Sequence, residues 1–173
     1  MSFLLIQQSY QAKLSLFLEK AGAGDWINDC LAKVEFAQQL ERAWGCSDFA
    51  ADQAIGDPQG FRQLVESGDL ERAYSQTTLL ESLQQKISVI PEDDEQALGK
   101  QLRLFRRREM QRIVWRDLNR LADLTETTRD VTLLAEACTS VALDYLHPMV
   151  AKNMGKPLDS DGNEQKLLVI AMG

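Results

Sequence analysis

Arginine side chains are concentrated in one stretch of this chain, Leu102 to Arg120, which reads LRLFRRREMQRIVWRDLNR. From Lys100 to Arg120 there are eight Lys or Arg residues and two acids, a local net charge of +6, whereas the whole chain carries −7. Guanidinium groups stay charged and bind carboxylates or phosphates through two parallel hydrogen bonds. The stretch therefore has the chemistry to meet phosphate or an acidic partner surface.

The spacing of these arginines predicts rows on one long helix. Arg108, Arg112, Arg116 and Arg120 recur every four residues and form a slowly winding stripe, and Arg103 and Arg107 form a neighbouring row. Three consecutive arginines point in different directions around a helix, so at least one of them is expected to face the protein body. The set is called the basic ridge, and it consists of Arg103, Arg106, Arg107, Arg108, Arg112 and Arg116.

Two interpretations of the basic ridge stay open. In the first, the ridge is a solvated face whose arginines pair with acids of the same chain, such as Asp117 and Asp123. In the second, some of the arginines bind a carboxylate on a neighbouring domain, or bind phosphate. The spacing alone does not decide which arginine does which.

No other motif in the chain predicts catalysis or a metal site. His147 is the only histidine and lies at the predicted end of a helix, where its charged form would favour the helix dipole. The run from Asp159 to Asn163 resembles a calcium loop, but Glu164 and Ile170 occupy the positions that need glycine and a carboxylate. Sequence motifs for phosphate loops, nucleophile elbows and zinc helices are absent. The sequence therefore predicts no catalytic residue, no metal ligand, and a polar turn at 159–163.

Helical periodicity dominates the elements that must position these residues. Glycine, proline and capping residues divide the chain into predicted helices at about Leu4–Lys20, Asp25–Trp44, Asp48–Ile55, Pro58–Glu66, Thr78–Ser88, Asp94–Asn119, and from Thr125 to just before Pro148. Lys166 to Met172 is the one predicted strand. The fold class is therefore mainly all-α, a multi-helix array with one short terminal strand. Residues 1–154 are predicted to form the helical region, and 155–173 a turn and the first strand of a further domain.

Composition narrows the class of protein. The chain has 173 residues, of which 45% are hydrophobic and 26% charged, as in soluble globular domains. The N-terminus has no secretory signal and the chain has no predicted membrane span, so no membrane partner is expected. The three cysteines Cys30, Cys46 and Cys138 have no metal-binding spacing and are expected to be free thiols in a reducing cytoplasm. The acidic balance argues against nucleic-acid binding, which only the basic ridge keeps open.

Two segments resemble a known family. The segments LRLFRRREMQRIVWRDL and LADLTETTRDVTLLAEACTSVALDYL are similar to the N-terminal half of the glutamate–ammonia-ligase adenylyltransferase family. SDFAADQAIGDPQGFRQLVESGDLERAYS resembles the same family upstream of the arginine-rich helix, so the likeness covers about residues 46–173. The resemblance implies a bifunctional enzyme that adenylylates and deadenylylates glutamine synthetase.

The resemblance also implies what this chain lacks. In the family, an apolar strand leads into a Gly-Met-Gly-Lys-Leu-Gly-Gly loop that cradles nucleotide phosphates, followed by two aspartates that hold a divalent metal. Ala171-Met172-Gly173 would be the first three residues of that loop, with Ala171 in place of glycine, so Gly173 alone matches a loop position. Magnesium and ATP or ADP are thus expected for the parent enzyme, and none is expected to bind to this fragment.

The expected roles follow from these observations. As an enzyme fragment, inactive alone, the chain would support the deadenylylating half, with the basic ridge as a buttress beneath the catalytic sheet or, less favoured, as part of the surface around its cleft. Glutamine synthetase and a nitrogen-signalling regulatory protein would be the partners of the parent enzyme. The alternative is a self-contained helical interaction module whose basic ridge docks an acidic protein.

Overall fold

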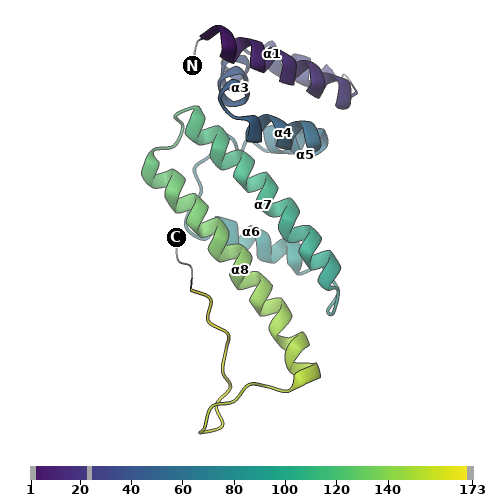
Figure 1. The fold of residues 1–173 in the computed structure, drawn as a ribbon, viewed down its shortest axis with the longest axis vertical. Coiled ribbons are helices and arrows are strands. Elements are labelled where there is room, and N and C mark those ends of the chain that lie inside the picture. Colours follow the sequence, from purple (N-terminus) through teal and green to yellow (C-terminus); the bar gives the residue numbers. More distant parts are fainter. Residues whose placement is uncertain (1–2, 23–24, 171–173) are drawn as a thin grey trace. The chain divides into compact units, whose positions relative to one another are not determined.

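The computed structural model describes residues 3–22 and 25–170, and in this part of the chain the regular elements are helices. The mainly helical class predicted from periodicity is therefore confirmed. The helices are α1 (Phe3–Lys20), α2 (Asp25–Leu31), α3 (Val34–Cys46), α4 (Asp48–Gly56), α5 (Pro58–Glu66), α6 (Thr78–Ile87), α7 (Glu95–Leu118) and α8 (Leu124–Met154) (Figure 1).

The helices belong to two compact units. Unit 1 consists of residues 1–73 and 107–131, and unit 2 of residues 74–106 and 132–173. The chain passes from one unit to the other within α7 and again within α8. The predicted division of the chain into a helical region ending at residue 154 and a further domain stays a prediction.

An aromatic cluster forms the centre of unit 1. The Phe17 ring of α1 lies 5.2 Å from the Trp44 ring of α3 and 5.9 Å from the Phe61 ring of α5, measured between centroids. Trp115 of α7 lies 6.3 Å from Phe61. Ring pairs at these separations add to the free energy gained by burying their area. The aromatic cluster therefore joins α1 to α7, the helix that carries the basic ridge.

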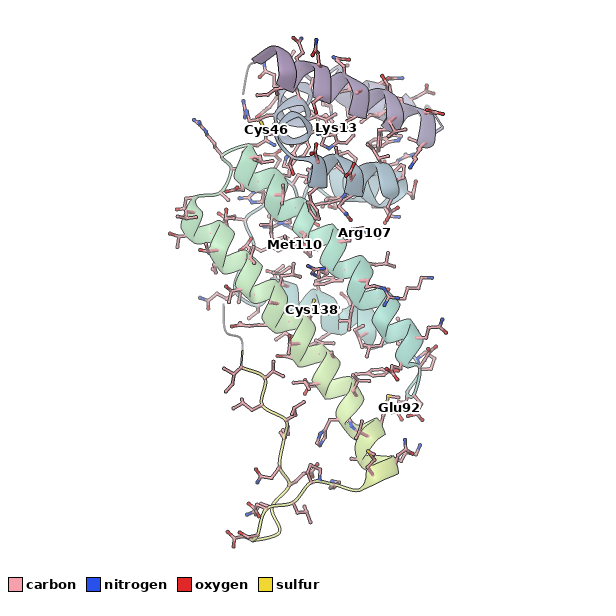
Figure 2. The ribbon with its side chains drawn as sticks, viewed as in Figure 1. Lys13, Cys46, Glu92, Arg107, Met110 and Cys138 are labelled. Carbon is pink, nitrogen blue, oxygen red and sulfur yellow. The ribbon has the colours of Figure 1, made fainter. Side chains whose placement is uncertain are left out.

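The first helix also approaches α3 closely. A Cβ atom at Gly45 would lie only 2.5 Å from Ile6 Cγ2, so the two helices meet at a position where a side chain does not fit. Lys13 Nζ donates to the Trp44 carbonyl oxygen at 2.7 Å and pairs with Asp48 Oδ1 at 2.6 Å (Figure 2). The two contacts fix α1 against the end of α3 and the start of α4.

Capping residues set the predicted starts of α4 and α5. The Ser47 hydroxyl accepts a hydrogen bond from the Ala50 backbone N–H at 3.2 Å, and α4 begins at the next residue. The Asp57 carboxylate accepts from the Gly60 N–H at 2.9 Å, with Pro58 at the first helical position of α5. Each side chain satisfies a donor that the helix leaves unpaired.

The single helix predicted for Asp25–Trp44 is wrong, because the chain breaks after Leu31. Lys33 has extended backbone angles and precedes α3, and its N–H donates to the Cys30 carbonyl three residues back. The break separates two different buried faces. Ile27 of α2 and Leu40 of α3 both lie in the core of unit 1. A change of chain direction lets each short helix turn its own apolar side inward.

The predicted helix end before Pro148 is also wrong, because α8 continues through this residue to Met154. Proline lacks an N–H and so removes one hydrogen bond of the helix ladder. Pro148 is exposed, so the freed carbonyl of the preceding turn lies on the solvent side. The helix tolerates the proline because water can replace the lost donor.

The predicted terminal strand is not found in the described residues. Residues 166–170 have no regular secondary structure, and 171–172 lie outside the described part of the chain. A strand exists only where its backbone groups pair with a neighbouring strand. The last backbone pairing here joins the Gln165 N–H to the Pro157 carbonyl at 2.8 Å, next to an isolated antiparallel bridge between Leu158 and Glu164. An apolar run without a neighbour therefore has no ladder to join.

Unit 2 buries one face from each of its helices. In α6 the buried apolar residues recur at four-residue intervals, as an amphipathic helix requires. In α8 they recur at three- and four-residue intervals. The buried apolar set in this unit is Tyr74, Leu79, Leu83, Ile87, Leu98, Phe105, Leu134, Ala137 and Val141.

Candidate functional site

Arg112 lies at the centre of a buried charge cluster in unit 1. Its side chain is 0% exposed. The guanidinium donates to Asp130 Oδ2 at 2.9 Å and to two backbone carbonyls, of Asp69 at 3.2 Å and of Arg72 at 2.7 Å. One planar group therefore fastens the segment after α5 to α7 and to the first turns of α8.

Arg116 repeats this arrangement one turn later. Its guanidinium pairs with Glu126 Oε1 at 2.9 Å and donates to the carbonyls of Leu70 at 3.2 Å and Leu121 at 2.9 Å. Only 4% of its side chain is exposed. A buried guanidinium is tolerated only when its donors are satisfied, and these contacts meet that condition.

Arg108 completes the paired row. It forms ion pairs with Asp69, which lies in the segment after α5, and with its neighbour Glu109. Asp69 is buried and also pairs with Arg72, so it joins two arginines from different segments. Arg108, Arg112 and Arg116 of the basic ridge are thus all paired with acids of unit 1.

The acids that fill these pairs are not the ones the sequence indicated. Asp117 instead accepts from the Thr127 hydroxyl at 3.1 Å, and Asp123 caps α8 by accepting from the Glu126 N–H at 2.7 Å. A signal for the true partners exists in the sequence. Glu126 and Asp130 are four residues apart, like Arg112 and Arg116. The first arginine pairs with the second acid and the second arginine with the first acid, across the short turn between α7 and α8. That mirrored spacing is what two antiparallel helices require for paired charges.

The remaining members of the basic ridge differ in their surroundings. Arg103, Arg106 and Arg107 are exposed, and no ion pair joins any of them to another residue in the described part of the chain. Arg107 is labelled on α7 in Figure 2. The ridge therefore divides into a paired, largely buried row and an exposed set, a division that side-chain type alone does not reveal.

Glu109 lies inside the charge cluster without full hydrogen bonding. It is 2% exposed, and within the described residues its Oε2 atom has no hydrogen-bond partner. Burial raises the pKa of the Glu109 carboxyl, and the nearby Arg108 and Arg112 charges oppose that rise without cancelling it. The ionised carboxylate lowers the stability of the folded protein here, because one of its oxygens has lost its hydrogen bonds to water and has no replacement in the described residues.

Replacing Glu109 with glutamine is expected to stabilise the protein at neutral pH by about 1 kcal/mol. Because the folded-state pKa is raised, the contribution of Glu109 to stability is fully present below its ordinary value of 4.5 and is lost as pH rises through the folded value. Glutamine does not titrate, so wild type and variant should converge in acid and separate above pH 4.5. Urea unfolding across this range measures the difference.

Glu136→Gln makes the same charge change at an exposed position of α8 and serves as the control. Its stability should follow the wild type at every pH, within about 0.5 kcal/mol. A Glu109→Gln protein that is less stable than wild type at neutral pH would show that the carboxylate's ion pair outweighs its unpaired oxygen.

A polar turn organises the end of unit 2. Asp159 Oδ1 accepts from the N–H groups of Asp161 at 2.9 Å and Asn163 at 2.8 Å, and these bonds lower the pKa of Asp159. Glu164 then pairs with His147 of α8 at 3.2 Å and with Lys156 at 2.8 Å, which lowers the pKa of Glu164. The turn is thereby tied to α8.

An open apolar groove of about 550 Å³ lies beside this turn in unit 2. Side chains of α8 and of the segment after the turn line it, among them Leu146, Val150 and Leu167. The four consecutive apolar residues from Leu167 to Ile170 are all exposed. The groove and this run give the C-terminal part of unit 2 an apolar surface, a feature that the strand prediction did not include.

The described residues do not form a metal site. Within residues 3–22 and 25–170, no group of three or more His, Cys, Asp or Glu side chains could hold a metal ion. Gly173, the one residue that matches the phosphate loop of the family, lies outside the described residues. The magnesium and nucleotide that the resemblance implies for the parent enzyme stay predictions. None of the described helices has the length and apolar character that a membrane crossing requires.

Comparison with known proteins gives a consistent answer. The family model described as glutamate-ammonia ligase adenylyltransferase matches residues 37–173. Curated relatives named bifunctional glutamine synthetase adenylyltransferase/adenylyl-removing enzyme include proteins from Pseudomonas aeruginosa (38% identical, covering 80% of this chain and 14% of the relative) and Nitrosococcus oceani (40%, 84% and 15%). A relative from Shewanella woodyi is 35% identical over 92% of this chain and 17% of its own length.

The chain therefore spans about one seventh of the length of these relatives. The resemblance seen in the arginine-rich helix and its neighbours is confirmed, and the match includes both the buried charge cluster and the exposed arginines. The chain belongs to the glutamate–ammonia ligase adenylyltransferase family.

Proposed function

We propose that this chain is the N-terminal helical part of a bifunctional enzyme that removes adenylyl groups from glutamine synthetase and attaches them. The family match over residues 37–173 is the observation that carries the proposal. The names of the relatives pair both activities with glutamine synthetase, and those relatives are several times longer than this chain. The catalytic machinery would then lie in the remainder of the parent polypeptide.

The removal reaction in this proposal is phosphorolysis of an adenylyl-tyrosine bond. An oxygen of orthophosphate attacks the adenylyl phosphorus, the bond from phosphorus to the tyrosine oxygen breaks, and the tyrosine hydroxyl regains a proton while ADP leaves. Magnesium neutralises phosphate charge in such transfers when it is bound, and ATP supplies the adenylyl group in the opposite direction. The ligands for both would lie outside this chain.

The role of this chain would be mechanical support. Phosphoryl-group transfer depends on holding the reacting groups in a fixed position, and a scaffold contributes by being rigid. Arg112 and Arg116 together make six donor contacts that hold three segments of unit 1, which suits a buttress. We propose the cytoplasm as the location and a nitrogen-signalling regulatory protein as a further partner of the parent enzyme.

The experiment compares two proteins on adenylylated glutamine synthetase. The full-length parent polypeptide, with orthophosphate and magnesium, is expected to release ADP and to restore the unmodified tyrosine. The chain of residues 1–173, tested alone at the same concentration, is expected to release none. Mass spectrometry of the glutamine synthetase tyrosine peptide and an ADP assay measure the two products independently.

Two results would contradict the proposal. Full-length protein that neither removes adenylyl groups from adenylylated glutamine synthetase nor attaches them to the unmodified protein would contradict the substrate assignment. ADP release by residues 1–173 alone would place the catalytic groups inside this chain, and the support role would then be wrong.

A further inference from the structure

Exposed cations of α7 in unit 2 form a short row, and two of them, Arg103 and Arg106, belong to the basic ridge. Lys100, Arg103 and Arg106 follow each other at three-residue intervals, so they cover about a third of the circumference of α7. All three are exposed, and no ion pair joins them to another residue in the described part of the chain. They are called the cation row.

The contrast with the rest of the helix is informative because the chain is rich in acids. It contains 26 Asp or Glu against 19 Lys or Arg. Further along α7, three arginines are paired with acids. Long charged side chains in an acidic protein readily find partners, yet no ion pair in the described part of the chain includes a member of the cation row. Leu104, one helical turn after Lys100, has 40% of its surface exposed. Arginine is one of the residue types that protein–protein interfaces favour.

We propose that the cation row is a docking surface for an acidic face of the protein substrate, glutamine synthetase. This proposal rests on the proposed function. Charge complementarity of this kind speeds encounter and fixes orientation more than it adds affinity, which suits an enzyme that must meet and leave a large protein. Nucleic acid is the other polyanion that such a row could bind, but the net charge of −7 makes the remaining surface repel it.

The test reverses two charges in the full-length enzyme. Lys100→Glu/Arg103→Glu is expected to raise the KM for adenylylated glutamine synthetase about tenfold at low salt, with kcat unchanged. The wild-type KM should rise with ionic strength, and the variant should lose most of that dependence. Lys20→Glu/Lys86→Glu makes the same change in net charge at exposed positions of α1 and α6 and should leave KM unchanged.

The outcomes separate this inference from the proposed function. An active wild type whose KM is the same in the cation-row variant, or equally changed in the control variant, would overturn the docking surface and leave the function standing. An inactive wild type would overturn the function on which the docking proposal rests. Binding of a fluorescent single-stranded oligonucleotide at low salt that Lys100→Glu/Arg103→Glu abolishes would assign the row to nucleic acid instead. Melting temperatures of both variants close to wild type confirm that the fold is retained.

Discussion

Arg112→Ala is expected to lower the free energy of unfolding by about 3–5 kcal/mol, the largest loss for any single charged side chain of the basic ridge. The substitution leaves Asp130 buried with one of its two arginine partners gone, because only Arg129 remains at its other oxygen. It also leaves the carbonyls of Asp69 and Arg72 without that donor. Urea unfolding followed by tryptophan fluorescence measures the loss.

Two further variants distinguish the charge cluster from a general effect of losing arginine. Arg107→Ala removes an exposed arginine from the same helix and should change stability by less than about 0.5 kcal/mol. Arg112→Met/Asp130→Leu removes both buried charges, and apolar side chains of similar size should recover much of the loss. If Arg112→Ala lowered the free energy of unfolding no more than Arg107→Ala, the buried ion pairs of Arg112 would not be what holds the segment after α5 in place.

Helix positions in this chain could be predicted where a local signal fixes them. Ser47 and Asp57 cap helices through contacts with residues three positions later, and such contacts depend on nothing distant. Proline at the first position of α5 has the same local character. The break at Lys33 carries no glycine or proline, and its cause is the direction in which two apolar faces must point. A cause of that kind lies in tertiary packing and leaves no mark in the local sequence.

The charge cluster shows a second limit. Sequence periodicity assumes that the inward face of a helix is apolar, whereas α7 buries Glu109, Arg112 and Arg116 together with Phe105 and Ile113. The arginine spacing was visible, but which arginines are buried depends on Asp69, forty or so residues away in the chain. Long-range pairing of this kind appears only once the segments are placed together.

The C-terminal run shows that strand propensity predicts a strand only together with its partner. Leu167 to Ile170 have the composition of a strand, yet the described residues offer them no paired neighbour. The turn before them was easier to predict, because Asp159 makes its hydrogen bonds within six residues. The turn could be predicted because its hydrogen-bond partners are close in the sequence, whereas the partner that a strand requires can lie anywhere in the chain.

Phe17→Ala is expected to cost about 3–5 kcal/mol and to loosen α1 from unit 1. The ring is 0% exposed and contacts three other aromatic rings, of Trp26, Trp44 and Phe61. Removing it leaves a cavity bounded by rigid rings, which cannot collapse to fill the space as flexible aliphatic chains do. Thermal unfolding, followed by the near-ultraviolet circular dichroism of the tryptophans, measures both the stability and the packing of the cluster.

This prediction tests whether the first helices belong with the part of the chain that the family model recognises, since that match begins at residue 37. Leu16→Ala is the matched control, because Leu16 is the preceding residue of α1 and 44% exposed. If α1 were only a loosely attached arm, both variants would keep the wild-type melting temperature. A loss confined to Phe17→Ala would instead show that α1 is part of the core of unit 1. That core also contains Trp115 of α7, because one cluster of buried residues includes both side chains.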